Sequence, residues 1–160
     1  MSSRPVLHQL VGLLGWLLLV FAAAAVGAIA SVNAQAFYGQ LVKPAWAPPA
    51  GVFGPVWSVL YSLIGVSAWL AWRSRASRAA FVLFFAQLAA NALWSWLFFA
   101  WHRGALAAAE VFVLLVLIAA TVRAFWQSSR VAAVLLPYLL WVAFASALTW
   151  SVWQANPGLL

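Results

Sequence analysis

The 160-residue sequence contains no cysteine and a single acidic residue, Glu110. Without cysteine the chain forms neither disulfides nor thiolate metal ligands. One carboxylate cannot supply the acid and base pair on which hydrolases and glycosidases depend. The two histidines, His8 and His102, are far apart in the sequence and lack a third ligand at metal spacing. We therefore expect no hydrolytic enzyme, no metal site and no required cofactor.

Charged residues of either sign are also scarce, at 6% of the chain against 68% hydrophobic residues. This composition lies far outside that of soluble domains. A membrane-spanning helix needs about 20 mainly apolar residues, and helices satisfy their own backbone hydrogen bonds in lipid. The first apolar run exceeds the roughly 7 to 15 residues typical of a signal peptide, so we expect a retained helix. We predict an all-α integral membrane bundle, one domain over residues 1–160, with five transmembrane helices at about 10–32, 53–72, 79–101, 105–126 and 131–153 and a loop at 33–52.

The net charge of +7 reflects eight basic residues that fall in loops and at helix ends. They are not spaced along a soluble face, so we expect no nucleic-acid partner. Basic residues concentrate on the cytoplasmic side of membrane proteins, which places the N-terminus in the cytoplasm and the loop 33–52 on the opposite side. One side of the predicted bundle holds Arg4, Arg73, Arg75, Arg78, Arg123 and Arg130, and the other holds Lys43 and Arg103.

Nine of the twelve tryptophans form two groups by position. One group falls at predicted helix ends, where an amphipathic ring lies at the level of the lipid headgroups, and needs no further explanation. The other group lies inside the predicted spans. The helix-end group is Trp69, Trp72, Trp101, Trp126 and Trp153, and the inner group is Trp57, Trp94, Trp96 and Trp141.

Two stripes at helical spacing contain these inner tryptophans. Gln87, Asn91 and Trp94 follow one another at i, i+4 and i+7. A similar stripe in the last span contains Tyr138, Trp141, Ala145 and Thr149. Polar groups at bilayer depth normally face the bundle interior, so an aromatic, weakly polar cavity is predicted there. The alternative is that the amides join neighbouring helices and the tryptophans fill the core.

Two residues within the spans leave alternatives open. Pro137, about seven residues into the last predicted span, should kink that helix, either as simple packing or to free a carbonyl for a ligand. Glu110 is costly in a membrane unless it is paired, and Arg103 is the nearby candidate partner. We expect either a structural ion pair or a polar point on a ligand or proton path.

Several motifs together resemble the translocator protein family, the TspO/MBR or tryptophan-rich sensory proteins. The resemblance covers about residues 10–155. It is carried by KPAWAPP at 43–49, GPVW at 54–57 followed by Tyr61, QLA at 87–89 leading to Asn91 and Trp94, FF at 98–99, and PYLLW at 137–141.

The resemblance implies a five-helix bundle, usually a homodimer, that binds porphyrins such as protoporphyrin IX and related flat hydrophobic ligands. The function expected is that of a membrane receptor or sensor that regulates the level or movement of tetrapyrroles. The alternatives are a transporter or channel subunit and a photo-oxidative enzyme that degrades porphyrin, in which Trp57 and Trp141 would be the reacting residues. The ligand-binding residues it implies are Lys43, Trp46, Pro48, Trp57, Tyr61, Asn91, Trp94, Tyr138, Trp141, Ala145 and Leu148.

The sequence departs from the family pattern near its end. Thr149 stands where the family often has asparagine. The sterol-recognition pattern needs a tyrosine and a basic residue, but the stretch 148–154 has Trp150 and no lysine or arginine. Cholesterol binding through that pattern is therefore not supported, whereas porphyrin binding is unaffected. Ala86 and Ala90 have the spacing of a close helix pair and could form the dimer interface.

Overall fold

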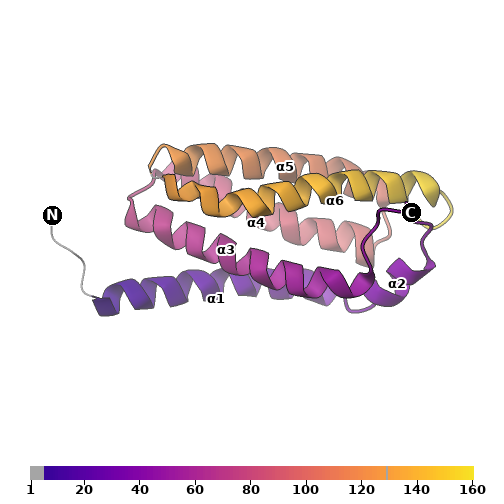
Figure 1. Cartoon of the computed structure of the whole chain (residues 1–160), viewed down its shortest axis with the longest axis horizontal. Helices are drawn as coiled ribbons and strands as arrows, with labels where there is room; N and C mark the ends of the chain where they lie inside the picture. The colour runs from indigo at the N-terminus through magenta and orange to yellow at the C-terminus, as the bar shows by residue number, and fades with distance from the viewer. Residues whose placement is uncertain (1–5, 129) are drawn as a thin grey trace.

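The computed structural model describes residues 6–128 and 130–160, which form a helical bundle without a strand in the described part of the chain (Figure 1). Five helices are long and apolar enough to cross a membrane, which confirms the predicted all-α membrane architecture. In chain order the elements are α1 (Val6–Ala30), α2 (Ala34–Gln40), η1 (Ala50–Val52), α3 (Phe53–Arg73), α4 (Arg78–Ser95), η2 (Trp96–Ala100), α5 (Gly104–Trp126), η3 (Arg130–Leu135) and α6 (Leu136–Ala155).

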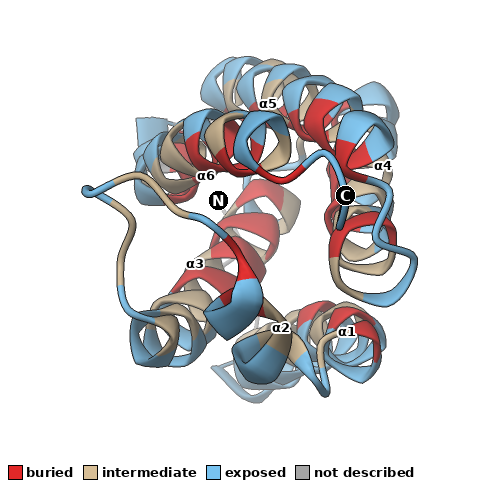
Figure 2. Ribbon diagram, turned by 90° about the vertical axis from the view of Figure 1, so that its right-hand side faces the viewer, coloured by how far each residue is buried: buried red, intermediate tan, exposed pale blue. Residues whose placement is uncertain are grey.

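The helices of the bundle enclose a shared interior, and their buried faces turn toward it (Figure 2). Short connections place α4 beside α5 and α5 beside α6, while α1 packs against both α3 and α4. Glycine allows the closest approaches. A Cβ on Gly65 of α3 would lie 2.8 Å from Cδ2 and 3.3 Å from Cα of Leu17 on α1. The backbones of α1 and α3 therefore touch at this glycine.

The ends of two helices differ from the prediction. α1 covers Val6–Ala30, where we expected 10–32, because the chain turns at 31–33 into the next helix. Before the last helix, residues Arg130–Leu135 form a 3₁₀ segment, so the α-helix begins at Leu136, where we expected 131.

The kink predicted at Pro137 is wrong for the same reason. Pro137 lies in the first turn of α6, where a residue without an N–H costs no helical hydrogen bond. The sequence places this proline inside a hydrophobic run, but hydrophobicity does not mark the point where a 3₁₀ segment gives way to an α-helix.

The connection 33–52, predicted as a loop, contains the short helix α2. α4 also ends differently from the prediction, because residues Trp96–Ala100 form a π-helical segment, η2. In this segment Trp101 N donates to Trp96 O at 2.8 Å, five residues back. The turn then closes at His102, whose φ of 51° lies in the left-handed region. Both segments lie at the end of the bundle that carries the candidate site (Figure 1).

Candidate functional site

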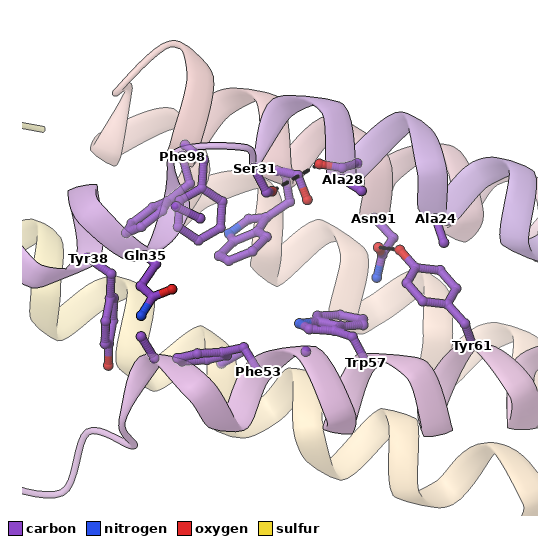
Figure 3. A pocket seen from close by; sticks show the side chains of 18 of the residues that line it. Ala24, Ala28, Ser31, Gln35, Tyr38, Phe53, Trp57, Tyr61, Asn91 and Phe98 are labelled. Carbon is purple, nitrogen blue, oxygen red and sulfur yellow. Dashed lines mark hydrogen bonds between the residues drawn. The ribbon is translucent and has the colours of Figure 1, made fainter.

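A cavity of about 690 Å³ lies in the bundle at the end nearest α2, and we call it the central cavity. Its walls come from α1, α2, α3, α4 with η2, and α6, whereas no described residue of α5 lines it. Small residues on two of these helices leave the space open: Ala24 and Ala28 on α1, and Ala145 on α6. Figure 3 shows Tyr38 near one end of the cavity and Tyr61 with Asn91 near the other.

The deep end of the central cavity is a buried hydrogen-bond network across three helices. Tyr61 Oη donates to Asn91 Oδ1 at 2.6 Å, and Asn91 Nδ2 donates to Tyr138 Oη at 2.9 Å. Tyr138 Oη in turn donates to Gln87 Oε1 at 2.9 Å. The amides of both Gln87 and Asn91 thus face the interior, as their spacing predicts. Asn91 and Tyr61 present this network to the cavity.

Aromatic rings line the middle of the central cavity. Trp57 lies with its ring centroid 5.5 Å from that of Tyr61 and 6.3 Å from that of Tyr138. One turn earlier on α3, Phe53 meets Trp141 of α6 edge to face at 6.1 Å. These indoles are held in place by neighbouring rings, which offers a flat apolar ligand fixed surfaces for stacking.

Tyr38 of α2 lies at the end of the central cavity next to the loop. Its hydroxyl donates to the carbonyl of Pro48 at 3.0 Å, and burial raises the pKa of Tyr38, which keeps the hydroxyl protonated. Lys43 Nζ donates to the carbonyls of Tyr38 and Leu41 at 2.7 and 2.8 Å and lies over the Tyr38 ring. The loop therefore folds back on α2 through its own polar groups.

Asn156, just after α6, fastens the same loop to the far end of the chain. Its Oδ1 accepts from Val42 N at 2.8 Å, and its Nδ2 donates to Val42 O at 2.9 Å and to Val152 O at 2.7 Å. The side-chain amide therefore pairs with the loop backbone as a neighbouring β-strand would. Nothing in the sequence pattern marks this role, since the partners lie 114 residues apart.

The structure brings most of the sequence-predicted ligand residues to the cavity wall. Trp57, Tyr61, Asn91, Trp94, Trp141, Ala145 and Leu148 line the cavity. The other four do not line it: Lys43, Trp46, Pro48 and Tyr138.

Each of these four residues has another position. Lys43 and Pro48 both form hydrogen bonds with Tyr38. Tyr138 lies behind Asn91 in the buried hydrogen-bond network. Trp46 is 49% exposed and meets Phe144 of α6 at 5.6 Å between ring centroids. We find that these residues support the cavity from outside its wall.

The sequence reasoning missed the wall that α1 provides. Phe21, Ala24 and Ala28 line the cavity from α1, and Ser31 lines it from the turn that follows. Their spacing of three and four residues follows one helix face, so the signal was present. It was hidden because almost every other residue of α1 is also small or apolar, which leaves no contrast between the faces.

The predicted ion pair between Glu110 and Arg103 is wrong. Both carboxylate oxygens of Glu110 are buried and have no hydrogen-bond partner in the described chain. Glu110 lies on α5 and does not line the central cavity. Arg103 lies at an exposed position just before α5. Glu110 therefore does not provide an acidic group on a path through the central cavity.

Comparison with known proteins agrees with this architecture. The profile of the TspO/MBR family matches residues 16–154. The human translocator protein is 39% identical over 128 residues, which cover 76% of this chain and 76% of the human protein. The tryptophan-rich sensory protein of Cereibacter sphaeroides is 38% identical over 146 residues, covering 88% and 92% of the two chains.

An archaeal relative extends the similarity. The tryptophan-rich protein TspO of Archaeoglobus fulgidus is 35% identical over 127 residues, covering 78% of this chain and 82% of its own. The matched range contains every residue of the central cavity wall and excludes only the two ends of the chain. The chain, a multi-pass integral membrane protein, therefore belongs to the TspO/MBR family.

Proposed function

We propose that this protein is a membrane receptor or sensor that binds porphyrins of the protoporphyrin IX type in the central cavity. The observation that carries the proposal is the pair of indoles, Trp57 and Trp141, on the wall of one cavity inside a membrane bundle. The cavity volume of about 690 Å³ is within the roughly 300 to 1,000 Å³ typical of small-molecule sites. Binding would in this way regulate the level or movement of a tetrapyrrole.

The chemistry of the wall supports a flat ligand with few polar groups. Offset or edge-on contacts with aromatic rings favour an extended π system, and each contributes about 0.5 to 1.5 kcal/mol beyond simple burial. Most of the wall is apolar, and its polar side chains include Asn91, Ser31, Gln35 and Thr149. Such a site orients a ligand by a few hydrogen bonds and gains most of its affinity from apolar contact.

Quenching of tryptophan fluorescence by protoporphyrin IX tests the proposal. The purified protein should show saturable quenching, and Trp141→Ala should weaken binding about 3- to 10-fold because it removes one aromatic wall. Trp126→Phe is the matched control, since Trp126 lies half-exposed at the end of α5 outside the cavity. Unsaturable quenching that Trp141→Ala leaves unchanged contradicts the proposal.

The proposal includes no enzymatic turnover and no resident cofactor. The porphyrin absorption spectrum should therefore stay constant in the dark, and any loss under light should be the same in Trp57→Phe and Trp141→Phe as in the parent. Breakdown with turnover that both variants abolish would identify an enzyme instead. Saturable porphyrin flux into liposomes would identify a transporter.

We further propose that the protein is a homodimer whose interface includes the α4 face with Ala86 and Ala90. Both alanines are only partly covered within the chain, next to exposed Val82 and Phe85. Small residues at this spacing let two helices approach closely in a membrane. Mass measurement in detergent should give a dimer that Ala86→Trp dissociates and that Val113→Trp, on the exposed side of α5, leaves intact.

A further inference from the structure

A second cavity, of about 560 Å³, lies on the opposite side of α2, and we call it the lateral cavity. It is formed by the end of α1, by α2 and by the π-helical segment η2 with the turn after it. Its main apolar walls are Ile29, Val32, Ala36, Phe37, Trp96 and Phe99.

The two cavities are separated by α2 alone along part of their boundary. Gln35 and Tyr38 face the central cavity, while Ala36 and Phe37 face the lateral one. Two further residues, Val32 and Phe99, line both cavities. At these two side chains the partition is therefore only one residue thick.

Ring contacts hold this partition to the lateral side of the bundle. Phe37 stacks on His102 with a centroid separation of 4.1 Å and meets Phe98 edge to face at 6.1 Å. The segment that carries these partners includes the π-helical turn and the left-handed backbone of His102. Both features cost conformational energy and are concentrated at places where proteins bind or move.

The rim of the lateral cavity next to α1 is apolar and exposed. Ile29 and Val32 are 64% and 78% exposed. Ile29 lies in the last turn of the membrane-spanning helix α1, and Val32 lies in the turn that follows it. A large apolar side chain left uncovered on a membrane span contacts lipid. A hydrophobic molecule dissolved in the bilayer can therefore reach this cavity without crossing water.

The part of the loop 33–52 that follows α2 is held more firmly. It is fastened by the hydrogen bonds of Tyr38 to Pro48 and of Asn156 to Val42. Separating these groups costs several hydrogen bonds at once, whereas the lateral side is held by ring stacking and apolar packing. Of these two routes, the lateral one is the less costly to open for an apolar molecule.

We infer that the lateral cavity is the access site through which a flat hydrophobic ligand passes from the bilayer into the central cavity, between Val32, Phe37 and Phe99. This inference rests on the proposed function, because it assigns a route to the same ligand. Trp96 and Phe99 offer stacking surfaces to the incoming ring system, and Asn33, Gln40 and His102 offer polar groups to its polar edge. The ligand class is an amphipathic aromatic macrocycle delivered by lipid.

The cysteine-free chain allows a direct test by blocking the lateral cavity. Ala36→Cys, modified with N-cyclohexylmaleimide, places a bulky group in it. Gly39→Cys with the same modification is the control, because Gly39 is on the same helix, lines neither cavity, and a Cβ there meets nothing within 4 Å. Phosphatidylcholine vesicles loaded with protoporphyrin IX are mixed with protein in phosphatidylcholine nanodiscs, and tryptophan quenching is followed by stopped flow.

Modified Ala36→Cys should associate at least about 10-fold more slowly than modified Gly39→Cys, with an equilibrium Kd within about 2-fold, because a blocked route slows binding and release alike. Circular dichroism of both modified proteins should match the parent. Equal association rates in the two modified proteins overturn the access route while leaving the proposed function intact. If the unmodified protein shows no saturable quenching, the proposed function fails and the route fails with it.

Discussion

Tyr138 lies where three helices meet, and its hydroxyl both accepts and donates a hydrogen bond inside the bundle. The stripe Gln87, Asn91 and Trp94 predicted this inward face of α4, because buried amides need partners and their spacing follows one side of a helix. The partners themselves could not be predicted, since the bonds to Asn91 span 30 and 47 residues of sequence. Spacing identifies a face, and only the packing identifies which side chain lies opposite.

We expect Tyr138→Phe to destabilise the protein more than Tyr61→Phe does. The first change leaves groups on both Asn91 and Gln87 without a partner, at about 1 to 3 kcal/mol for each buried group, whereas the second removes one bond only. Unfolding in a mixed detergent series, followed by circular dichroism, measures the difference. Equal losses in the two variants would show that the Tyr138 hydroxyl is not the centre of the network.

Among the helices and their connections, composition predicted the long apolar elements well and the short ones poorly. Each transmembrane helix can be recognised in the sequence as a run of about 20 mainly apolar residues. The seven residues of α2 belong to a connection whose later part is rich in proline and polar residues, so the connection as a whole resembles a loop. The π-helical turn of η2 arises from a shift in backbone hydrogen bonding, which no particular residue type signals. Because α2 and η2 separate the central cavity from the lateral cavity, the division into two cavities could not be predicted from the sequence.

The contact between α1 and α3 should not tolerate a side chain at Gly65. In Gly65→Ala the new methyl group would press on Leu17, including its backbone, and overpacking of this kind costs about 1 to 3 kcal/mol. Gly15→Ala on α1 is the control, because its Cβ meets nothing within 4 Å and alanine favours a helix. The melting temperature should fall in the first variant and stay level or rise in the second, and a fall in both would refute the close contact.

Loss of the Asn156 amide should release the loop 33–52 while leaving the spans in place. In Asn156→Ala the Val42 N–H loses its partner, so its hydrogen exchange should accelerate about 10-fold or more, as expected for loss of about 1.4 kcal/mol. Asn33→Ala, which removes an exposed amide that caps nothing, should leave exchange at Val42 unchanged. Unaltered exchange in both variants would mean that other contacts hold the loop.

Across the whole molecule, the basic residues divide between the two ends of the bundle. Arg73, Arg78 and Arg123 lie at the ends of α3, α4 and α5 that meet the start of α1, and Lys43 and Arg103 lie at the end with α2 (Figure 1). Arg4, which adds to the same bias, is outside the described residues. We propose that the end with the start of α1 is cytoplasmic.

Single cysteines in the otherwise cysteine-free chain report this orientation. A membrane-impermeant maleimide added to intact cells should label Gly51→Cys at once and Ser74→Cys only after permeabilisation, because the two exposed sites lie at opposite ends of the bundle. Arg103→Gln is a charge control that should not alter the pattern, since it removes a basic residue from the side that has fewer of them and so increases the bias. Immediate labelling of Ser74→Cys alone would reverse the orientation.

The distribution of the indoles has an optical consequence. Trp101, Trp126 and Trp150 are about half exposed on the outside of the bundle, whereas Trp57, Trp94 and Trp141 line the central cavity. Lipids with brominated acyl chains would shorten the excited-state lifetime of the outer set, and an absorbing molecule in the interior would shorten that of the inner set. The protein thus carries, without any added dye, one emission signal for the bilayer around it and another for the contents of its cavity.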